Sequence, residues 1–90
     1  MQFEWDDSKN TLNMHKHKLS FYEAQTVFLD RKRIILPDTK HSSEEKRYFC
    51  IGKASTGGIA TVRFTKRKGS IRIIGAGYWR EGKKLYDQQY

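Results

Sequence analysis

The chain has 90 residues with one proline and seven glycines, which is enough for a single domain over residues 1–90 and excludes a long flexible linker. A hydrophobic content of 37% with 13% aromatic residues excludes a disordered chain, and no run of about 18 apolar residues is present to cross a membrane. The net charge of +8 is uneven, because residues 46–90 hold eleven Lys and Arg against two Asp and Glu, whereas residues 1–45 hold seven against eight. Such a basic half attracts polyanions, and we expect nucleic acid rather than a lipid surface as the partner.

The N-terminal segment, MQFEWDDSKN, indicates a cytoplasmic protein. It carries acids and a tryptophan where a signal peptide has basic and then apolar residues. Cys50 is the single cysteine, which excludes an internal disulfide and agrees with a reducing compartment. We therefore expect the chain to act in the cytoplasm, with Cys50 as a buried thiol.

The first half of the chain predicts one strand and two helices. Residues 3–5 alternate between apolar and polar, as a short strand does. Asp6 is placed to cap a helix over residues 7–17. Ser20 opens a Ser-x-x-Glu capping box, which predicts a second helix over residues 20–29. One face of that helix gathers side chains that we expect in the core: Phe21, Ala24, Val27 and Phe28.

The second half predicts mainly strands. Residues 33–36 form a strand that stops at the turn signal Pro37-Asp38, and residues 41–45 indicate a polar loop. Glycine-containing turns separate three β-rich runs that should form an antiparallel meander: residues 47–53, 59–66 and 70–76. Residues 80–89 suggest a last helix. The order β-α-α-β-β-β-β-α predicts an α+β fold with an antiparallel sheet and helices packed on one face.

Several segments together match a family pattern in the right order. They are Phe3-x-Trp5-Asp6-x-x-Lys9-x-x-x-Asn13-x-x-Lys16-His17, Ser20-Phe21-x-Glu23-Ala24, Val27-Phe28-x-Asp30, Asp38, His41-Ser42, Glu45-x-Arg47-Tyr48-x-x-Ile51-Gly52 and Arg72-Ile73-Ile74. Over most of its length the chain resembles the BrnT toxin family. The resemblance implies a RelE-like fold and a metal-independent endoribonuclease that inhibits translation and growth. It also implies a type II toxin–antitoxin system, with a DNA-binding antitoxin encoded next to the toxin.

The chain departs from the family pattern after its last strand. Where the family usually continues Arg-Ile-Ile-Ser-Ala-Arg, this chain has Arg72-Ile73-Ile74-Gly75-Ala76-Gly77, so the second arginine is absent. Either Arg80 supplies the missing cation from nearby, or catalysis is weakened.

Two arginines are candidates for stabilising charge on a phosphate. Cleavage of RNA without a metal uses the 2′-hydroxyl as nucleophile, so the protein must accept its proton, stabilise the charged phosphorus and protonate the departing 5′-oxygen. Arginine suits the middle task because its planar donors match two phosphate oxygens. Arg47 is favoured by the family pattern, and Arg72 by its place in an apolar run, where an unpaired cation is costly. Each could instead be a solvated charge on a strand.

Proton transfer has its own candidates. His41 lies in the polar loop near Asp38. Histidine is the side-chain type that suits proton transfer near neutral pH. Tyr86 could donate to a phosphate from the last helix, or could be a core aromatic. His17 and Glu45 have alternatives in helix capping and in pairing with Arg47, respectively. The predicted catalytic set is therefore Arg47, Arg72, His41, Arg80 and Tyr86.

Further basic and aromatic residues are expected to bind RNA. They are Lys53, Arg63, Lys66, Arg67, Trp79, Lys83 and Lys84. Trp79 could stack on an unpaired base or fill the core. We expect no metal and no cofactor, because His15 and His17 point about 200° apart on a helix, and a single cysteine makes a zinc site improbable.

Three functions stay open on the sequence. The first is an endoribonuclease toxin acting on RNA. The second is a catalytically weakened nucleic-acid binder of the same fold. The third is an interaction protein whose basic face serves an acidic partner, which is compatible with the first if the antitoxin covers the RNA site.

Overall fold

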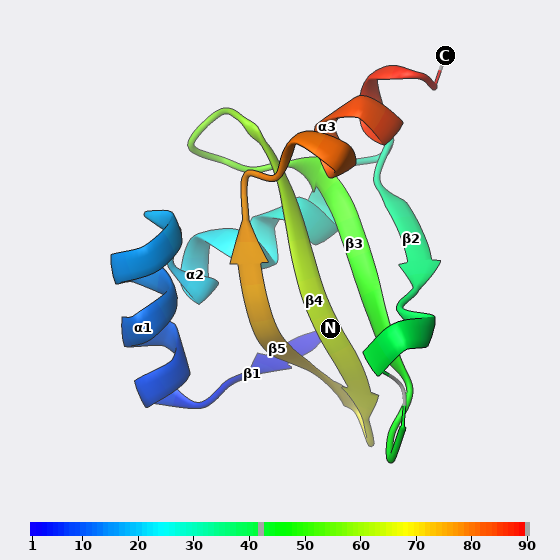
Figure 1. Cartoon of the computed structure of the whole chain (residues 1–90). Coiled ribbons are helices and arrows are strands. Elements are labelled where there is room, and N and C mark those ends of the chain that lie inside the picture. The colour runs from blue at the N-terminus through cyan, green and yellow to red at the C-terminus, as the bar shows by residue number, and fades with distance from the viewer. Residues whose placement is uncertain (42, 90) are drawn as a thin grey trace.

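The computed structural model describes residues 1–41 and 43–89, so Ser42 of the family pattern lies outside the described residues. Five strands form one sheet in the order β1-β5-β4-β3-β2, with helices on both faces (Figure 1). The elements are β1 (Gln2–Glu4), α1 (Asp7–His17), α2 (Phe21–Ala24), the 3-10 helix η1 (Gln25–Leu29), β2 (Ile34–Pro37), the 3-10 turn η2 (Thr39–His41), β3 (Arg47–Lys53), β4 (Ile59–Arg67), β5 (Ser70–Gly77) and α3 (Arg80–Asp87).

The α+β class and the element order agree with the sequence prediction, but two features of the architecture differ from it. The edge strand β1 pairs with β5 in parallel, so the sheet is not wholly antiparallel. The prediction that all helices pack on one face is also wrong. Figure 1 shows α2 behind the sheet and α3 in front of it. The reason is Gly82, whose missing side chain lets α3 approach Thr61 and Ile51 on the front face.

The core lies between the back face of the sheet and the segment formed by α2 and η1. Phe21, Ala24, Val27 and Phe28 are buried there, as their helical spacing predicts. The sheet contributes the buried side chains of Cys50, Val62, Phe64, Ile73 and Ala76. The ring of Phe28 meets that of Phe64 edge-on, with centroids 5.0 Å apart.

A β-bulge in β5 allows two of these core positions to lie three residues apart. Phe64 pairs with Ile73, whereas Arg63 pairs with Gly75, so Ile74 is an extra residue in β5. Strict alternation would turn Ala76 away from the core after Ile73. Because of the bulge, Ala76 points into the core after all, and Gly75 and Gly77 lie on the front face.

Hydrogen bonds from Asn13 fix α1 against the end of β5. This buried amide donates to the carbonyls of Leu19 and Ala76, both at 2.9 Å, and accepts from the amide of Ala76 at 3.1 Å. The helix begins and ends as the sequence predicts, with Asp6 accepting from the amide of Ser8 at 2.8 Å. Because all of its polar atoms are used, Asn13 holds α1 beside the front face of the sheet.

Replacing Gly82 by alanine tests the close contact between α3 and the sheet. In an exposed helix this change stabilises by about 0.5–1 kcal/mol. Here the new methyl group would collide with Thr61 Oγ1, so we expect a loss of about 1–3 kcal/mol in the free energy of unfolding. Urea denaturation measures it, with the exposed Lys84→Ala in the same helix as control. A stabilised Gly82→Ala variant would contradict the packing described.

Candidate functional site

Four arginines from three adjacent strands share the front face of the sheet. Thr65 of β4 pairs with Arg47 of β3 on one side and with Arg72 of β5 on the other, so the three side chains lie next to one another across the sheet. Arg63 and Arg67 lie two residues before and after Thr65 on the same strand and therefore point to the same side. Since neighbouring strands are about 4.8 Å apart, the four side chains leave the same face of the sheet from adjoining positions. We call Arg47, Arg63, Arg67 and Arg72 the arginine row.

Two arginines of the row form ion pairs with carboxylates of the same chain. Arg72 donates to Glu4 at 2.8 Å, and Arg67 donates to Glu45 at 3.2 Å. Hydrogen bonds from Ser70 and Arg72 hold the pKa of the Glu4 carboxyl below its ordinary value. These pairs orient the guanidinium groups and offset part of their positive charge.

A buried carboxylate next to the row holds a histidine. Asp38 is only 4% exposed, and its Oδ2 lies 3.0 Å from Nδ1 of His41, whose side chain is 52% exposed. Nε2 is the ring nitrogen that does not contact Asp38. The same Oδ2 lies 3.9 Å from Nε of Arg63, so the carboxylate links the histidine to the arginine row. Asp38 was not among the predicted catalytic residues, although its spacing of three from His41 after the Pro37 turn is a signal that could have found it.

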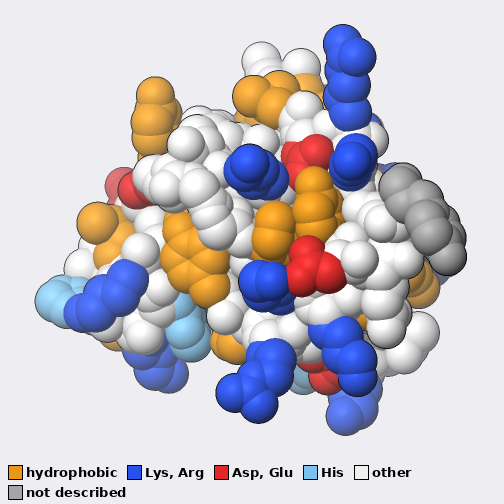
Figure 2. Space-filling view, turned by 90° about the horizontal axis from the view of Figure 1, so that it is seen from above, with side chains coloured by type: hydrophobic (Ala, Val, Ile, Leu, Met, Phe, Trp, Pro, Cys, Tyr) orange, Lys and Arg blue, Asp and Glu red, His pale blue; other side chains and the backbone are white. Residues whose placement is uncertain are grey.

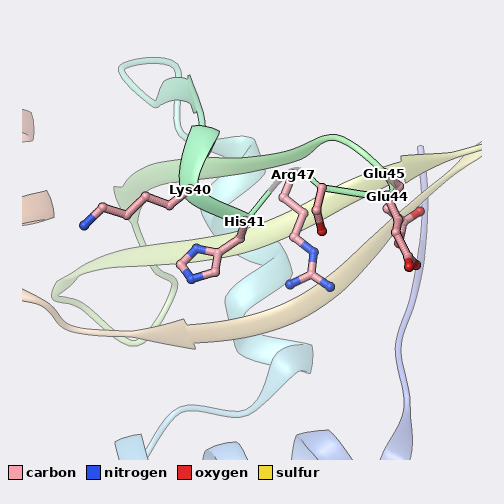
Figure 3. A pocket seen from close by; sticks show the side chains of 6 residues that line it. Lys40, His41, Glu44, Glu45 and Arg47 are labelled. Atoms are coloured by element: carbon pink, nitrogen blue, oxygen red, sulfur yellow. The ribbon is translucent and has the colours of Figure 1, made fainter.

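His41 and Arg47 line one polar hollow. Its volume is about 420 Å³, and it is bordered by Lys40, Ser43, Glu44 and Glu45 as well. Figure 3 shows the imidazole of His41 and the guanidinium of Arg47 projecting to the same side of the chain. The hollow thus brings together an imidazole ring and a guanidinium group, both of which are in the predicted catalytic set.

A second hollow lies on the other side of Arg63. It has a volume of about 220 Å³ and lies between α1 and the end of β5. Its lining includes Lys16, His17 and Trp79 together with Arg63. The indole of Trp79 covers Gly77, since a Cβ at Gly77 would be 2.7 Å from Trp79 Cε2. Trp79, and not Arg80, therefore occupies the space above the position where the family pattern has an arginine.

The structure places Tyr86 away from the arginine row. Its hydroxyl donates to Asp30 Oδ2 at 2.5 Å, and this hydrogen bond raises the pKa of Tyr86 to about 12. Asp30 Oδ2 also accepts from the backbone amide of Lys53 at 2.7 Å. Through Asp30, Tyr86 ties α3 to the end of β3, so the structure does not bring this predicted catalytic residue to the arginine row.

The remaining predicted residues are distributed over other surfaces. Lys66 lies 5.1 Å from the centroid of the Tyr48 ring, on the back side of β4. The outer side of α3 carries Arg80, Lys83 and Lys84, and Lys83 forms an ion pair with Asp87 at 2.6 Å. Figure 2, which looks down on the end of the molecule that carries α3, shows Lys and Arg side chains around a group of hydrophobic ones. This basic surface is separate from the arginine row.

Neither a metal cluster nor a membrane helix is found within residues 1–41 and 43–89. Three or more His, Cys, Asp or Glu side chains do not come together there in a way that could hold an ion. None of the helices in that part of the chain has the length and apolar character needed to span a bilayer.

A family model decides the assignment. The model of the ribonuclease toxin BrnT, of type II toxin–antitoxin systems, matches residues 5–82. The chain belongs to the BrnT family. Among solved structures, the ribonuclease toxin BrnT of Brucella abortus has the same fold, with a TM-score of 0.68 and 21% identity over 88% of this chain and 96% of that one. No curated protein matches the sequence.

Nearly all residues of the candidate site lie within the range that the family model matches. Asp38, His41 and the arginine row lie inside residues 5–82, whereas most of α3 and its basic surface lie at or beyond the end of that range. Glu4, which pairs with Arg72, precedes the matched range. The matched range therefore covers the strands that carry the arginine row, whereas the partner of Arg72 comes from the N-terminal strand.

Acidification tests the Glu4–Arg72 pair. Because the folded-state pKa of Glu4 is below its ordinary 4.5, the pair contributes stability above that pH and loses it as the pH falls through the folded-state pKa. We expect Glu4→Gln to lower Tm at neutral pH, and the difference from wild type to shrink below pH 4.5. Melting curves across the acid range measure it, with Glu44→Gln as the exposed control. A Tm difference that does not change with pH would argue against the pair.

Proposed function

We propose that this chain is a metal-independent endoribonuclease, the toxin of a type II pair, which cleaves RNA by attack of the 2′-hydroxyl and thereby inhibits translation and growth. The observation that carries the proposal is the convergence of the arginine row and the Asp38–His41 pair on one face of a BrnT-family sheet. Such a toxin acts in the cytoplasm, where its substrate is.

In this proposal the arginine row stabilises the negative charge on the phosphate during cleavage. A phosphodiester on the front face would receive planar guanidinium donors from two sides of Thr65, through Arg47 and Arg72. Arg63 approaches from the next position along β4, and its Nε is buried without a hydrogen-bond partner among the described residues. Because this Nε is shielded from solvent, a phosphate would meet the outer part of the Arg63 side chain, which is 30% exposed.

His41 is the proposed general acid–base. Asp38 contacts Nδ1, so Nε2 is the nitrogen that would exchange a proton with the 2′-hydroxyl or with the departing 5′-oxygen. A buried carboxylate in this position fixes the orientation of the ring and its tautomer. His41 lines the same hollow as Arg47, which keeps the proton-transfer group beside the charge-stabilising group.

The antitoxin is proposed to bind the same face. Glu4, Glu45 and Asp38 already contact arginines there, so this face has the geometry to bind carboxylates. An acidic antitoxin segment would satisfy the same cations as RNA and exclude it by competition. RNA cleavage that continues in the saturated complex would contradict this arrangement.

A binder without catalytic activity is the second candidate function. Gly77 in place of the family arginine and the carboxylate partners of Arg67 and Arg72 favour it. It predicts RNA affinity that falls steeply between about 50 and 200 mM salt, with the RNA left intact.

Replacing His41 tests the proposed nuclease directly. Purified protein incubated with RNA and a chelator should produce fragments that end in a 2′,3′-cyclic phosphate. We expect His41→Ala to lower kcat about 10²–10⁴-fold, because the proton-transfer group is lost. His15→Ala on the exposed side of α1 is the matched control and should keep full activity. Intact RNA with correctly folded wild type would leave only the binder.

Asp38→Asn tests the orientation of the histidine. The amide cannot accept hydrogen bonds on both atoms, so the ring loses its tautomer preference while the site keeps its shape. We expect kcat to fall by up to about 10⁴-fold, with little change in the affinity for a non-cleavable RNA. Equal losses of Tm and of affinity would instead indicate that Asp38 has only a structural role.

A further inference from the structure

The hollow between α1 and the end of β5 combines an aromatic wall with basic residues. Trp79 forms one side, Lys9, Lys16 and His17 come from α1, and Arg63 opens onto it from the front face of the sheet. The floor includes Gly75, which carries no side chain. Its volume of about 220 Å³ is below the roughly 300–1,000 Å³ of sites for drug-sized ligands. The space therefore suits a single planar ring system.

Two contacts fix the indole of Trp79. One side of the ring lies on Gly77, where any Cβ would collide with it. The ring of His17 meets it edge-on, with centroids 5.2 Å apart. Trp79 also lines an apolar hollow beneath α3, beside Gly82 and Leu85. The side chain is still 36% exposed, so a fixed aromatic surface remains open to a ligand.

We propose that this hollow is a subsite for one unpaired nucleobase of the RNA, with Trp79 as the stacking surface and with Lys9 and Lys16 contacting the adjoining phosphates. The inference rests on the proposed function, because Arg63 would have to hold the phosphate that joins this base to the cleavage point. It adds a recognition element on the opposite side of Arg63 from His41.

Arg63 lines the Trp79 hollow and also lies next to Asp38, which contacts His41 of the first hollow. Its Nε lies 3.9 Å from Asp38, the partner of His41, while the same residue lines the Trp79 hollow. A strand of RNA that crosses Arg63 would thus have His41 on one side and Trp79 on the other. Bases in single strands expose their faces for stacking, which is how aromatic side chains commonly bind them.

Gly77 makes the subsite a property of this chain. An arginine at position 77 would place its Cβ where the indole lies, and Trp79 would have to move. The glycine at position 77 therefore leaves the room that the indole of Trp79 occupies.

The test measures binding apart from cleavage. The probe is a short, fluorescently labelled single strand in which every 2′-hydroxyl is replaced by hydrogen, together with a series that lacks one base at each position in turn. Anisotropy gives Kd for wild type, Trp79→Ala, Trp79→Phe and Tyr78→Ala. The last variant is the matched control, since Tyr78 is an exposed neighbouring aromatic that does not line the hollow.

We expect Trp79→Ala to raise Kd for the intact strand about 5- to 150-fold, and Trp79→Phe to raise it less, because phenylalanine keeps part of the stacking surface. At one position of the series, removal of the base should weaken binding to wild type but leave binding to Trp79→Ala unchanged. Equal effects of Trp79→Ala at every position, or a Kd equal to that of Tyr78→Ala, would overturn the subsite.

The outcome separates this inference from the proposed function. Position-dependent binding without RNA cleavage would keep the subsite and refute the nuclease. Cleavage by wild type with no Trp79-dependent position would keep the nuclease and refute the subsite. Melting curves of the four proteins ensure that the Kd values compare folded chains.

Discussion

The pairing register of β3, β4 and β5 is the constraint on which the candidate site depends. Side chains alternate between the two faces of a strand, so a slip of one residue would move the arginines into the core and expose Val62 and Phe64. Burial of those core side chains against α2 and η1 therefore fixes the register, and the register places the arginine row on the front face. The bulge at Ile74 completes the arrangement, because it leaves glycines rather than Ala76 beneath Trp79.

The arginines of the front face attract a polyanion, but carboxylates of the chain offset part of their positive charge. Each of Arg63, Arg67 and Arg72 has a carboxylate nearby, and the charge excess of residues 46–90 is spread over α3 and the back of β4 as well. Exposed pairs such as Arg67–Glu45 contribute little to stability, and a phosphate can replace the carboxylate at small cost. The buried Asp38 is different, because its interactions with His41 and Arg63 cannot be exchanged for water.

Much of the fold could be predicted from local signals. Asp6 and Ser20 mark helix starts, and the structure begins its helices beside them. Glycine turns marked the limits of the meander to within a residue. The parallel pairing of β1 and the side on which α3 packs could not be predicted in this way. Both depend on contacts between residues far apart in the chain, such as Gly82 with Thr61.

The candidate site shows the same division. Residue type and family pattern selected His41, Arg47 and Arg72. The register brings the two arginines to one face, and His41 lines the same hollow as Arg47. The role of Tyr86 could not be predicted, because its hydroxyl is engaged by Asp30, 56 residues away. Asp38 was not predicted as a catalytic residue, although its partner is near in the sequence. It is close in sequence to His41, but its burial, which makes it able to orient the ring, becomes apparent only in three dimensions.

The most direct measurement of the central claim is the response of the arginines to a pentacoordinate phosphorus mimic. Uridine vanadate is titrated into the protein while the Nε–H resonances of the guanidinium groups are followed by NMR. The account predicts that Arg47, Arg63 and Arg72 shift together with one dissociation constant, while Arg31 and Arg33 stay unchanged. Shifts confined to Arg80, or to one arginine of the row alone, would contradict a shared phosphodiester site on the front face.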